Sequence, residues 1–270
     1  MASKWKPDVS SWLGLGLATA ALVGGLLLEG GVVQDITQYT AAIIVLGGTL
    51  GAVMVNTPLK TLKGALGRLR EVFFEPEQSQ NQLIEEVVLF ASRARKTGLV
   101  SLEDEVSSLD DPFLRKAMSM AVDGSDLTEL RSAMELEIAV AEHHAEAEAK
   151  VFEAAGGYAP TIGIIGAVLG LIQVMKHLDN IEEVGHGIAV AFVATVYGVA
   201  LANLFCLPAA AKIKARIAAE SERRELILEG VAGIVEGLNP KLIRAKLSAY
   251  TQGANRKGGG GDAGPKAMAA

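Results

Sequence analysis

The sequence offers one small group of side chains that could bind a metal ion. His143 and His144 stand among acidic residues, and Glu148 follows four residues after His144. That spacing places His144 and Glu148 on one face of a helix, where they could supply two ligands. A solvated face of a charged helix accounts for the same residues without any ligand. We therefore predict no metal site. With no phosphate-binding glycine loop in the sequence, we also predict no cofactor and no enzymatic activity.

Four long stretches of the chain carry no Asp, Glu, Lys, Arg or His. Their polar side chains are mainly Thr49, Thr161, Gln173, Thr195, Tyr197 and Asn203. Proton transfer across a bilayer usually needs a titratable side chain near its middle. The chain is therefore either outside any ion pathway, or it forms part of one whose carboxylate comes from a partner.

The uncharged stretches are long enough to cross a membrane. They comprise residues 9–28, 36–59, 154–175 and 187–211. At about 1.5 Å per helical residue, each crosses a hydrocarbon core roughly 30 Å thick. Half of the 270 residues are hydrophobic and 21% are charged, with the charges concentrated between the stretches. This partition predicts an integral membrane protein with four spans.

Lysine and arginine predict how the spans are oriented. The short loop 29–35 contains neither residue and the loop 176–186 contains one, whereas ten lie near the other ends of the spans. Both termini and the long middle segment are therefore expected in the cytoplasm. Pro160 and Pro208 then stand at matching depth near the cytoplasmic ends of spans 3 and 4. Each could start or stop a helix, or act as a hinge, and the sequence leaves both possibilities open.

The expected fold is all-α, with four transmembrane helices and a helical cytoplasmic domain between spans 2 and 3. Helix signals in the soluble parts include Pro58, Gly98, the pair Asp111-Pro112 and Asp126. No strand pattern is convincing. We divide the chain into spans 1 and 2 (1–59), the cytoplasmic domain (60–153), spans 3 and 4 (154–211), C-terminal cytoplasmic helices (212–250) and a disordered tail (251–270).

Small residues four apart predict close helix packing within the membrane. The pairs are Gly47 with Gly51, Gly166 with Gly170, and Ala194 with Gly198. The single cysteine, Cys206, lies inside a span and is expected to be a small buried hydrophobe. The net charge of −6 argues against a nucleic-acid partner.

Several segments resemble one family in order along nearly the whole chain. Residues 158–172 read YAPTIGIIGAVLGLI and resemble the third span of MotA-type stator proteins of the flagellar motor. Residues 191–203 read AFVATVYGVALAN and, with Pro208, are similar to the fourth span. Residues 93–103, RARKTGLVSLE, resemble the segment that meets the rotor. Glu229-Gly230 and residues 237–241, GLNPK, are similar to the family's C-terminal helix end.

The resemblance implies an assembly in the bacterial inner membrane. Five copies of the chain would surround two copies of a single-span MotB-like partner. The partner's aspartate would carry the ion, which would explain the missing carboxylate here. Ion flow would turn the ring within the lipid and drive the rotor protein FliG.

The resemblance also assigns roles to residues of this sequence. Pro160 and Pro208 match the family's two functional prolines, and Thr195 matches the threonine that faces the partner's aspartate. Ala167 stands where sodium-driven members carry threonine, which implies proton drive. Thr161 departs from the small apolar residue usual after the first proline and leaves ion choice partly open.

The charged segment between the soluble helices would contact the rotor. Arg95 and Glu103 match the family's charged pair, and Arg93 and Lys96 belong to the same interface. Two other functions are open at this point. ExbB/TolQ-like proteins share the channel core but typically have three spans, and a membrane scaffold would conduct no ions.

Overall fold

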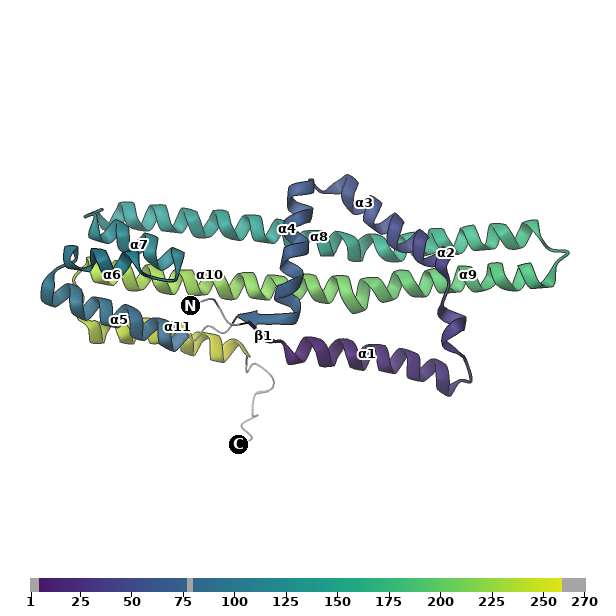
Figure 1. The fold of residues 1–270 in the computed structure, drawn as a ribbon, viewed down its shortest axis with the longest axis horizontal. Helices are drawn as coiled ribbons and strands as arrows, with labels where there is room; N and C mark the ends of the chain where they lie inside the picture. Colours follow the sequence, from purple (N-terminus) through teal and green to yellow (C-terminus); the bar gives the residue numbers. More distant parts are fainter. Residues whose placement is uncertain (1–4, 77–79, 259–270) are drawn as a thin grey trace, which may run out of the picture. The chain divides into compact units, whose positions relative to one another are not determined.

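The computed structural model describes residues 5–76 and 80–258, and side chains up to residue 249. Over this part of the chain the structure is helical apart from two short strands, as the sequence predicts for an all-α fold (Figure 1). The chain divides into two compact units. We call residues 5–76 and 143–217 the membrane unit, and residues 80–142 and 218–258 the head unit.

Four helical runs are long and apolar enough to cross a membrane, which confirms the four predicted spans. The first is α1 (Val9–Leu28), and the second joins α2 (Tyr39–Ala42), the π-helical turn η2 (Ile43–Gly47) and α3 (Gly48–Asn56). The third is the C-terminal half of α8 (Leu127–Lys176). The fourth joins α9 (Ile181–Ala200), the π-helical turn η4 (Leu201–Cys206) and α10 (Leu207–Val235).

The second span ends earlier than predicted, at Asn56 rather than at residue 59. Thr57 is extended, with φ −130° and ψ 131°, because the following proline disfavours the helical conformation. Pro58 then caps α4 (Leu59–Phe73), so the predicted helix start at this proline is confirmed.

Spans 3 and 4 pack backbone to backbone through small residues. A Cβ atom built on Gly198 would lie 2.5 Å from the carbonyl oxygen of Ala159, and one on Gly170 would lie 2.8 Å from that of Gly187. The predicted close packing of Gly166, Gly170, Ala194 and Gly198 is therefore confirmed. For Gly47 and Gly51 the prediction is wrong within one chain, because nothing lies within 4 Å of a Cβ built on either.

A two-stranded ribbon joins residues 5–7 to the end of α4, which corrects the expectation that the chain has no strand. Strand β1 (Trp5–Pro7) pairs antiparallel with β2 (Phe74–Pro76). Next to it, buried Asp8 caps α1 by accepting a 3.1 Å hydrogen bond from the Ser11 amide.

The carboxylate of Asp8 also joins the ends of two spans. It lies 2.6 Å from Lys212 Nζ and 2.7 Å from Arg216 Nη2. Burial raises the pKa of Asp8, but hydrogen bonds from Lys212, Ser10 and the Ser11 amide outweigh it and lower the pKa overall. The beginning of span 1 and the end of span 4 therefore lie at one level.

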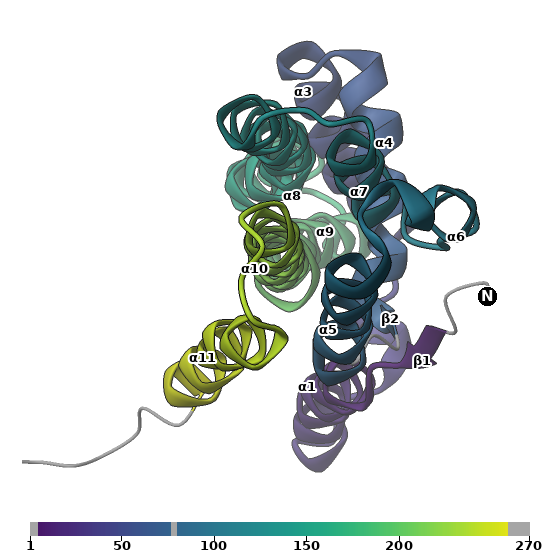
Figure 2. The ribbon, with the colours of Figure 1, turned by 90° about the vertical axis from the view of Figure 1, so that its left-hand side faces the viewer.

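The head unit, whose helices α5, α7 and α11 are labelled in Figure 2, has its own apolar core. It contains α5 (Gln80–Thr97), η3 (Val100–Leu102), α6 (Glu103–Ser107), α7 (Pro112–Val122), the start of α8, the end of α10 and α11 (Pro240–Gly258). Its fully buried side chains include Leu114, Met118, Leu130, Met134, Leu226, Ile243 and Leu247. Gly98 and Gly124 end their helices with φ of 87° and 81°, which glycine adopts without strain.

The C-terminal helix is longer than predicted. Helix α11 continues to Gly258, whereas the sequence predicted a helix end near Tyr250 and a disordered tail from residue 251. Residues 259–270 lie outside the described part of the chain, so that prediction stays open for them.

A half-buried carboxylate joins three helices of the head unit. Glu229 Oε1 of α10 lies 2.6 Å from Arg131 Nη1 of α8, and Glu229 Oε2 lies 2.5 Å from Lys246 Nζ of α11. The hydrogen bond from Arg131, opposed by burial and assisted by Lys246, lowers the pKa of Glu229 to about 2.

We expect Glu229→Gln to lower the free energy of unfolding of the head unit by about 2 kcal/mol at pH 7. A carboxyl group with a depressed pKa stabilises the fold above its unfolded pKa, and this stabilisation is lost as the pH falls toward about 2. Hydrogen exchange of the full chain in detergent, from pH 7 to pH 3, measures the difference. Glu85→Gln is the matched control, because its pair with Arg244 is exposed and is worth under about 1 kcal/mol. Equal losses in both variants would contradict the prediction.

Candidate functional site

Thr195 lies on α9, three residues before Gly198, where small residues bring that helix close to α8. Its side chain is half-buried, and its hydroxyl donates to the carbonyl oxygen of Ala191 at 3.2 Å. A Cβ on Gly163 of α8 would lie 3.4 Å from the Thr195 Cα and 2.9 Å from the Ala194 oxygen. The small residues around Thr195 therefore fix its place on the hairpin of spans 3 and 4.

Two further predicted channel residues, Thr161 and Ala167, lie along α8. Thr161 is exposed, and its hydroxyl donates to the Tyr158 carbonyl oxygen at 2.8 Å. Ala167 is half-buried and brings no polar atom beyond its backbone. In the described part of the chain, Thr161 and Thr195 each make their side-chain hydrogen bond within their own helix, so the structure does not join them.

Both prolines lie inside continuous helices, so neither starts or stops one. Pro160 is an internal residue of α8, and Pro208 follows the π-helical turn η4 in the run from α9 to α10. A proline leaves the carbonyl four residues earlier without its usual partner, and such helices locally kink or change their turn. A Cβ on Gly156, one turn before Pro160, would lie 2.6 Å from the side chain of Leu207. The two proline turns are therefore neighbours, as their matching depth predicts.

Tyr197 is a candidate that the sequence identified only as a polar residue in a span. Its hydroxyl donates to the Ile36 carbonyl oxygen at 2.5 Å and accepts from the Gln38 amide at 3.3 Å. Residues two apart on a helix point in roughly opposite directions, so Tyr197 holds the side of α9 that faces away from Thr195. This contact fixes the rotation of α9 about its axis. In the sequence, Tyr197 stands out only as a hydroxyl-bearing residue within an apolar run.

The predicted rotor-contact residues lie in the head unit. Arg95 and Lys96 are exposed in the last turn of α5, and Glu103 is exposed at the first residue of α6. None of these three has an ion pair among the described residues. Arg93 differs, because its guanidinium pairs with Glu105.

The remaining candidate was the histidine pair. The rings of His143 and His144 are 6.4 Å apart, between centroids. Among residues 5–76 and 80–258, no three His, Cys, Asp or Glu side chains gather as a metal would require. Cys206 is buried, as predicted.

Comparison with known proteins gives consistent matches. Residues 105–226 match the MotA/TolQ/ExbB proton channel family, and residues 12–98 match the family described as motility protein A N-terminal. Motility protein A of Bacillus subtilis is 38% identical over 92% of this chain and 93% of its own length. Chemotaxis protein PomA of Vibrio alginolyticus is 31% identical over 90% of this chain and 95% of its own.

Solved structures agree with the sequence matches. The C. jejuni MotAB structure superposes with a TM-score of 0.86 at 34% identity, over 90% of this chain and 95% of that one. The flagellar MotAB stator complex from Bacillus subtilis gives a TM-score of 0.85 at 37% identity, over 94% and 100%. The chain therefore belongs to the MotA/TolQ/ExbB proton channel family, as a subunit of the flagellar stator type.

Proposed function

We propose that five copies of this chain surround two copies of a MotB-like single-span protein and couple proton flow to torque on the rotor protein FliG. The observation that carries the proposal is chemical. The four spans contain no Asp, Glu, Lys, Arg or His, yet they present a half-buried threonine close to the tightest contact between spans 3 and 4. A partner's aspartate would supply the acid that these spans lack. One charge falling through 100 mV releases about 2.3 kcal/mol, which is enough to drive a mechanical step.

The proposed orientation places both termini and the head unit in the cytoplasm. Ten Lys and Arg residues lie near those ends of the spans and one near the others. The joining of Asp8 with Lys212 supports a common level for the start of span 1 and the end of span 4. Pro160 and Pro208 would then lie where movement of the spans passes to the cytoplasmic helices.

The stator function is favoured over that of an ExbB/TolQ-like energiser. The motility protein A N-terminal match covers residues 12–98, which include the first two spans, and this chain has four spans where ExbB/TolQ-like proteins typically have three. A scaffold that conducts no ions has no observation in its favour.

Reversing both rotor-contact charges, Arg95→Glu with Glu103→Lys, is expected to impair torque more than ion flow. Both side chains are exposed and without ion pairs among the described residues, so they are available to opposite charges on FliG. Exposed pairs are worth under about 1 kcal/mol each, so single changes should act mildly. Tethered-cell torque is the measurement, and complementary changes on FliG should partly restore it.

A matched control for this experiment is Lys116→Glu with Glu137→Lys. These residues already form an exposed pair within the head unit, and the double change keeps the pair while reversing it. Normal torque in the Arg95 and Glu103 double variant would show that these are ordinary surface charges.

Protons rather than sodium ions are expected to drive the motor. A bare sodium ion needs several oxygen ligands to replace its water. Ala167 offers no side-chain oxygen, and among the predicted channel residues only Thr161 and Thr195 bring one each, which is fewer than a sodium ion needs. Motor speed should therefore stay constant when external sodium is varied at fixed pH and membrane potential. A speed that vanishes without sodium would reject proton drive, and Ala167→Thr is the variant in which to look for a gain of sodium dependence.

A further inference from the structure

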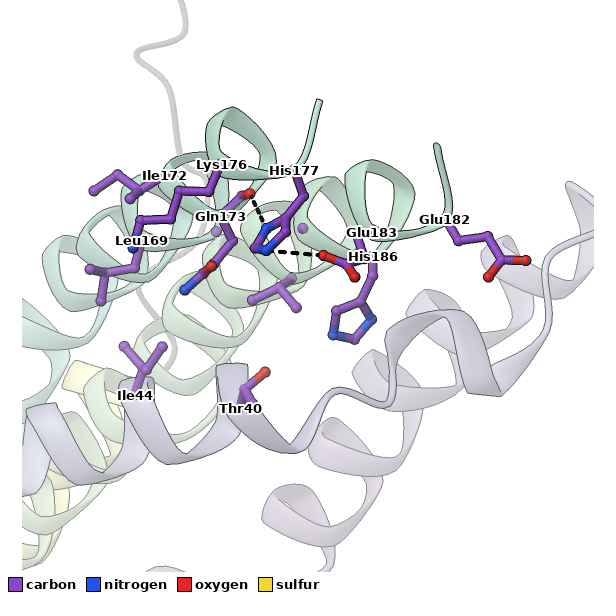
Figure 3. Close-up of a pocket in the computed structure, with 13 residues that line it drawn as sticks. Thr40, Ile44, Leu169, Ile172, Gln173, Lys176, His177, Glu182, Glu183 and His186 are labelled. Atoms are coloured by element: carbon purple, nitrogen blue, oxygen red, sulfur yellow. Dashed lines mark hydrogen bonds and ion pairs between the residues drawn. The ribbon is translucent and has the colours of Figure 1, made fainter. Parts of the chain in front are cut away.

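A cavity of about 820 Å³ opens in the membrane unit where the turn between α8 and α9 meets the beginning of α2 (Figure 3). This volume is within the range of sites that enclose small molecules. The cavity lies at the ends of the spans that are remote from Asp8 and Lys212. It is therefore separate from the proline turns.

The inner wall of the cavity is apolar. Ile44 of η2, Leu169 and Ile172 of α8, and Val190 of α9 line it. All four lie within membrane spans, and the first three side chains are visible around the cavity in Figure 3. A hydrocarbon chain can occupy such a wall without leaving any polar group unsatisfied.

The rim of the cavity is polar and partly unpaired. His177 is engaged, with its Nε2 3.2 Å from Glu183 Oε2 and its Nδ1 3.1 Å from the Gln173 carbonyl oxygen. The side chains of Gln173, Lys176 and His186 have no hydrogen-bond partner in the part of the chain that the structure describes. Figure 3 shows Lys176 extended along the apolar wall, and Gln173 and His186 directed from the hairpin toward α2.

The neighbouring residues indicate that this rim lies at the depth of lipid headgroups. Tyr39, next to the cavity residue Thr40, is 80% exposed at the first residue of α2. An exposed tyrosine at the end of a span is typical of the membrane–water interface. The contacts of Tyr197 with Ile36 and Gln38 hold this end of α2 in place. An apolar wall below and a charged rim above match a phospholipid.

The charged side chains on the rim determine which phospholipid headgroup fits the cavity. Lys176 is its one fixed cation, against the two carboxylates of Glu182 and Glu183. This excess of negative charge disfavours an anionic lipid. A zwitterion with a hydrogen-bonding ammonium fits both signs, because its phosphate can accept from Lys176 and its ammonium can donate to the Glu183 carboxylate. That carboxylate faces His177 and accepts from Asn180 Nδ2 at 3.3 Å, and its remaining lone pairs can take the ammonium. We propose that this cavity binds one phospholipid of the phosphatidylethanolamine type.

Native mass spectrometry tests the proposal on the full chain purified with its partner in mild detergent. After delipidation, the complex is titrated with phosphatidylethanolamine, phosphatidylglycerol and phosphatidylcholine of identical acyl chains. We expect phosphatidylethanolamine to bind about tenfold more tightly than the other two, and Lys176→Gln and Glu183→Gln each to weaken it about tenfold. Leu169→Trp, which fills the cavity, should also reduce binding.

Glu29→Gln is the matched control, because Glu29 is an exposed carboxylate in the other short loop and does not line the cavity. Equal binding of the three lipids, a preference for phosphatidylglycerol, or unchanged binding in the Lys176 and Glu183 variants would overturn the proposal. A further contradicting result would be a Leu169→Trp complex that still binds lipid but has a different number of subunits. The filled cavity would then have displaced a second copy of the chain, and not a lipid. The experiment measures lipid binding and does not measure motility. A negative result would therefore reject the lipid site without contradicting the proposed stator function.

Discussion

Gly198→Val is expected to abolish motility in cells that depend on this protein and its partner. A Cβ at this position would lie 2.5 Å from the Ala159 carbonyl oxygen and 3.1 Å from the Gly163 Cα. Both are backbone atoms, so a side-chain rotation cannot relieve the clash and α8 and α9 must move apart. Overpacking costs about 1–3 kcal/mol and occasionally more, and we expect the upper end here. Membrane helices gain little from apolar burial and depend on such close contacts.

Gly185→Val is the matched control for this prediction. It makes the same change in the same helix, at a position where nothing lies within 4 Å of the new Cβ. Thermal unfolding of the purified complex and swimming in soft agar measure the two variants side by side. A Gly198→Val complex that unfolds at the wild-type temperature and swims normally would show that the close contact of spans 3 and 4 is dispensable.

Long apolar patterns predicted the membrane fold well, whereas features made by contact between distant residues were not predictable. The four spans follow from uncharged length alone, and the cap at Pro58 follows from local backbone chemistry. Strands β1 and β2 are three residues each and contain prolines, so neither carries an alternating pattern. They exist because residues some seventy positions apart pair with each other.

The proline turns show the same limit. A proline in a sequence indicates an interruption of the helix, because its ring nitrogen has no hydrogen to donate to the carbonyl four residues earlier. In the structure Pro160 is accommodated within α8 and Pro208 directly after a π-helical turn, and packing against the neighbouring span keeps both helices continuous. Sequence reasoning could identify the positions but could not decide between a helix end and an uninterrupted helix.

The sequence predicted only part of the candidate site, because contacts between distant residues decide which side chains are engaged. Thr195 and Ala167 could be chosen from the resemblance, but Tyr197 gained importance only when its hydroxyl was seen to join α9 to Ile36. Arg93 was grouped with Arg95 because of its position in the segment, yet it pairs with Glu105 while Arg95 remains unpaired among the described residues. Which side chain of a charged segment is engaged depends on the folded helices around it.

Removal of the partner's membrane aspartate is expected to stop ion flow completely, although this chain is unchanged. The spans of this chain offer hydroxyls, side-chain amides, one thiol and backbone carbonyls, but no Asp, Glu, Lys, Arg or His that could take up and release a proton near neutral pH. A proton cannot cross the bilayer core unless some group carries it, because a bare charge there is costly to desolvate. We therefore expect the carboxylate that carries the proton to come from outside this chain.

Proton flux into proteoliposomes tests this account most directly. Vesicles would contain this chain alone, the chain with its MotB-like partner freed of any inhibitory segment, or the chain with a partner whose membrane aspartate is replaced by asparagine. An imposed membrane potential drives the flux, and a pH-sensitive dye inside the vesicles records it. We predict acidification only with the chain and the unaltered partner together, and the background rate of empty vesicles in the other two. Acidification by this chain alone, or with the asparagine partner, would contradict the claim that the ion is carried by the partner's carboxylate.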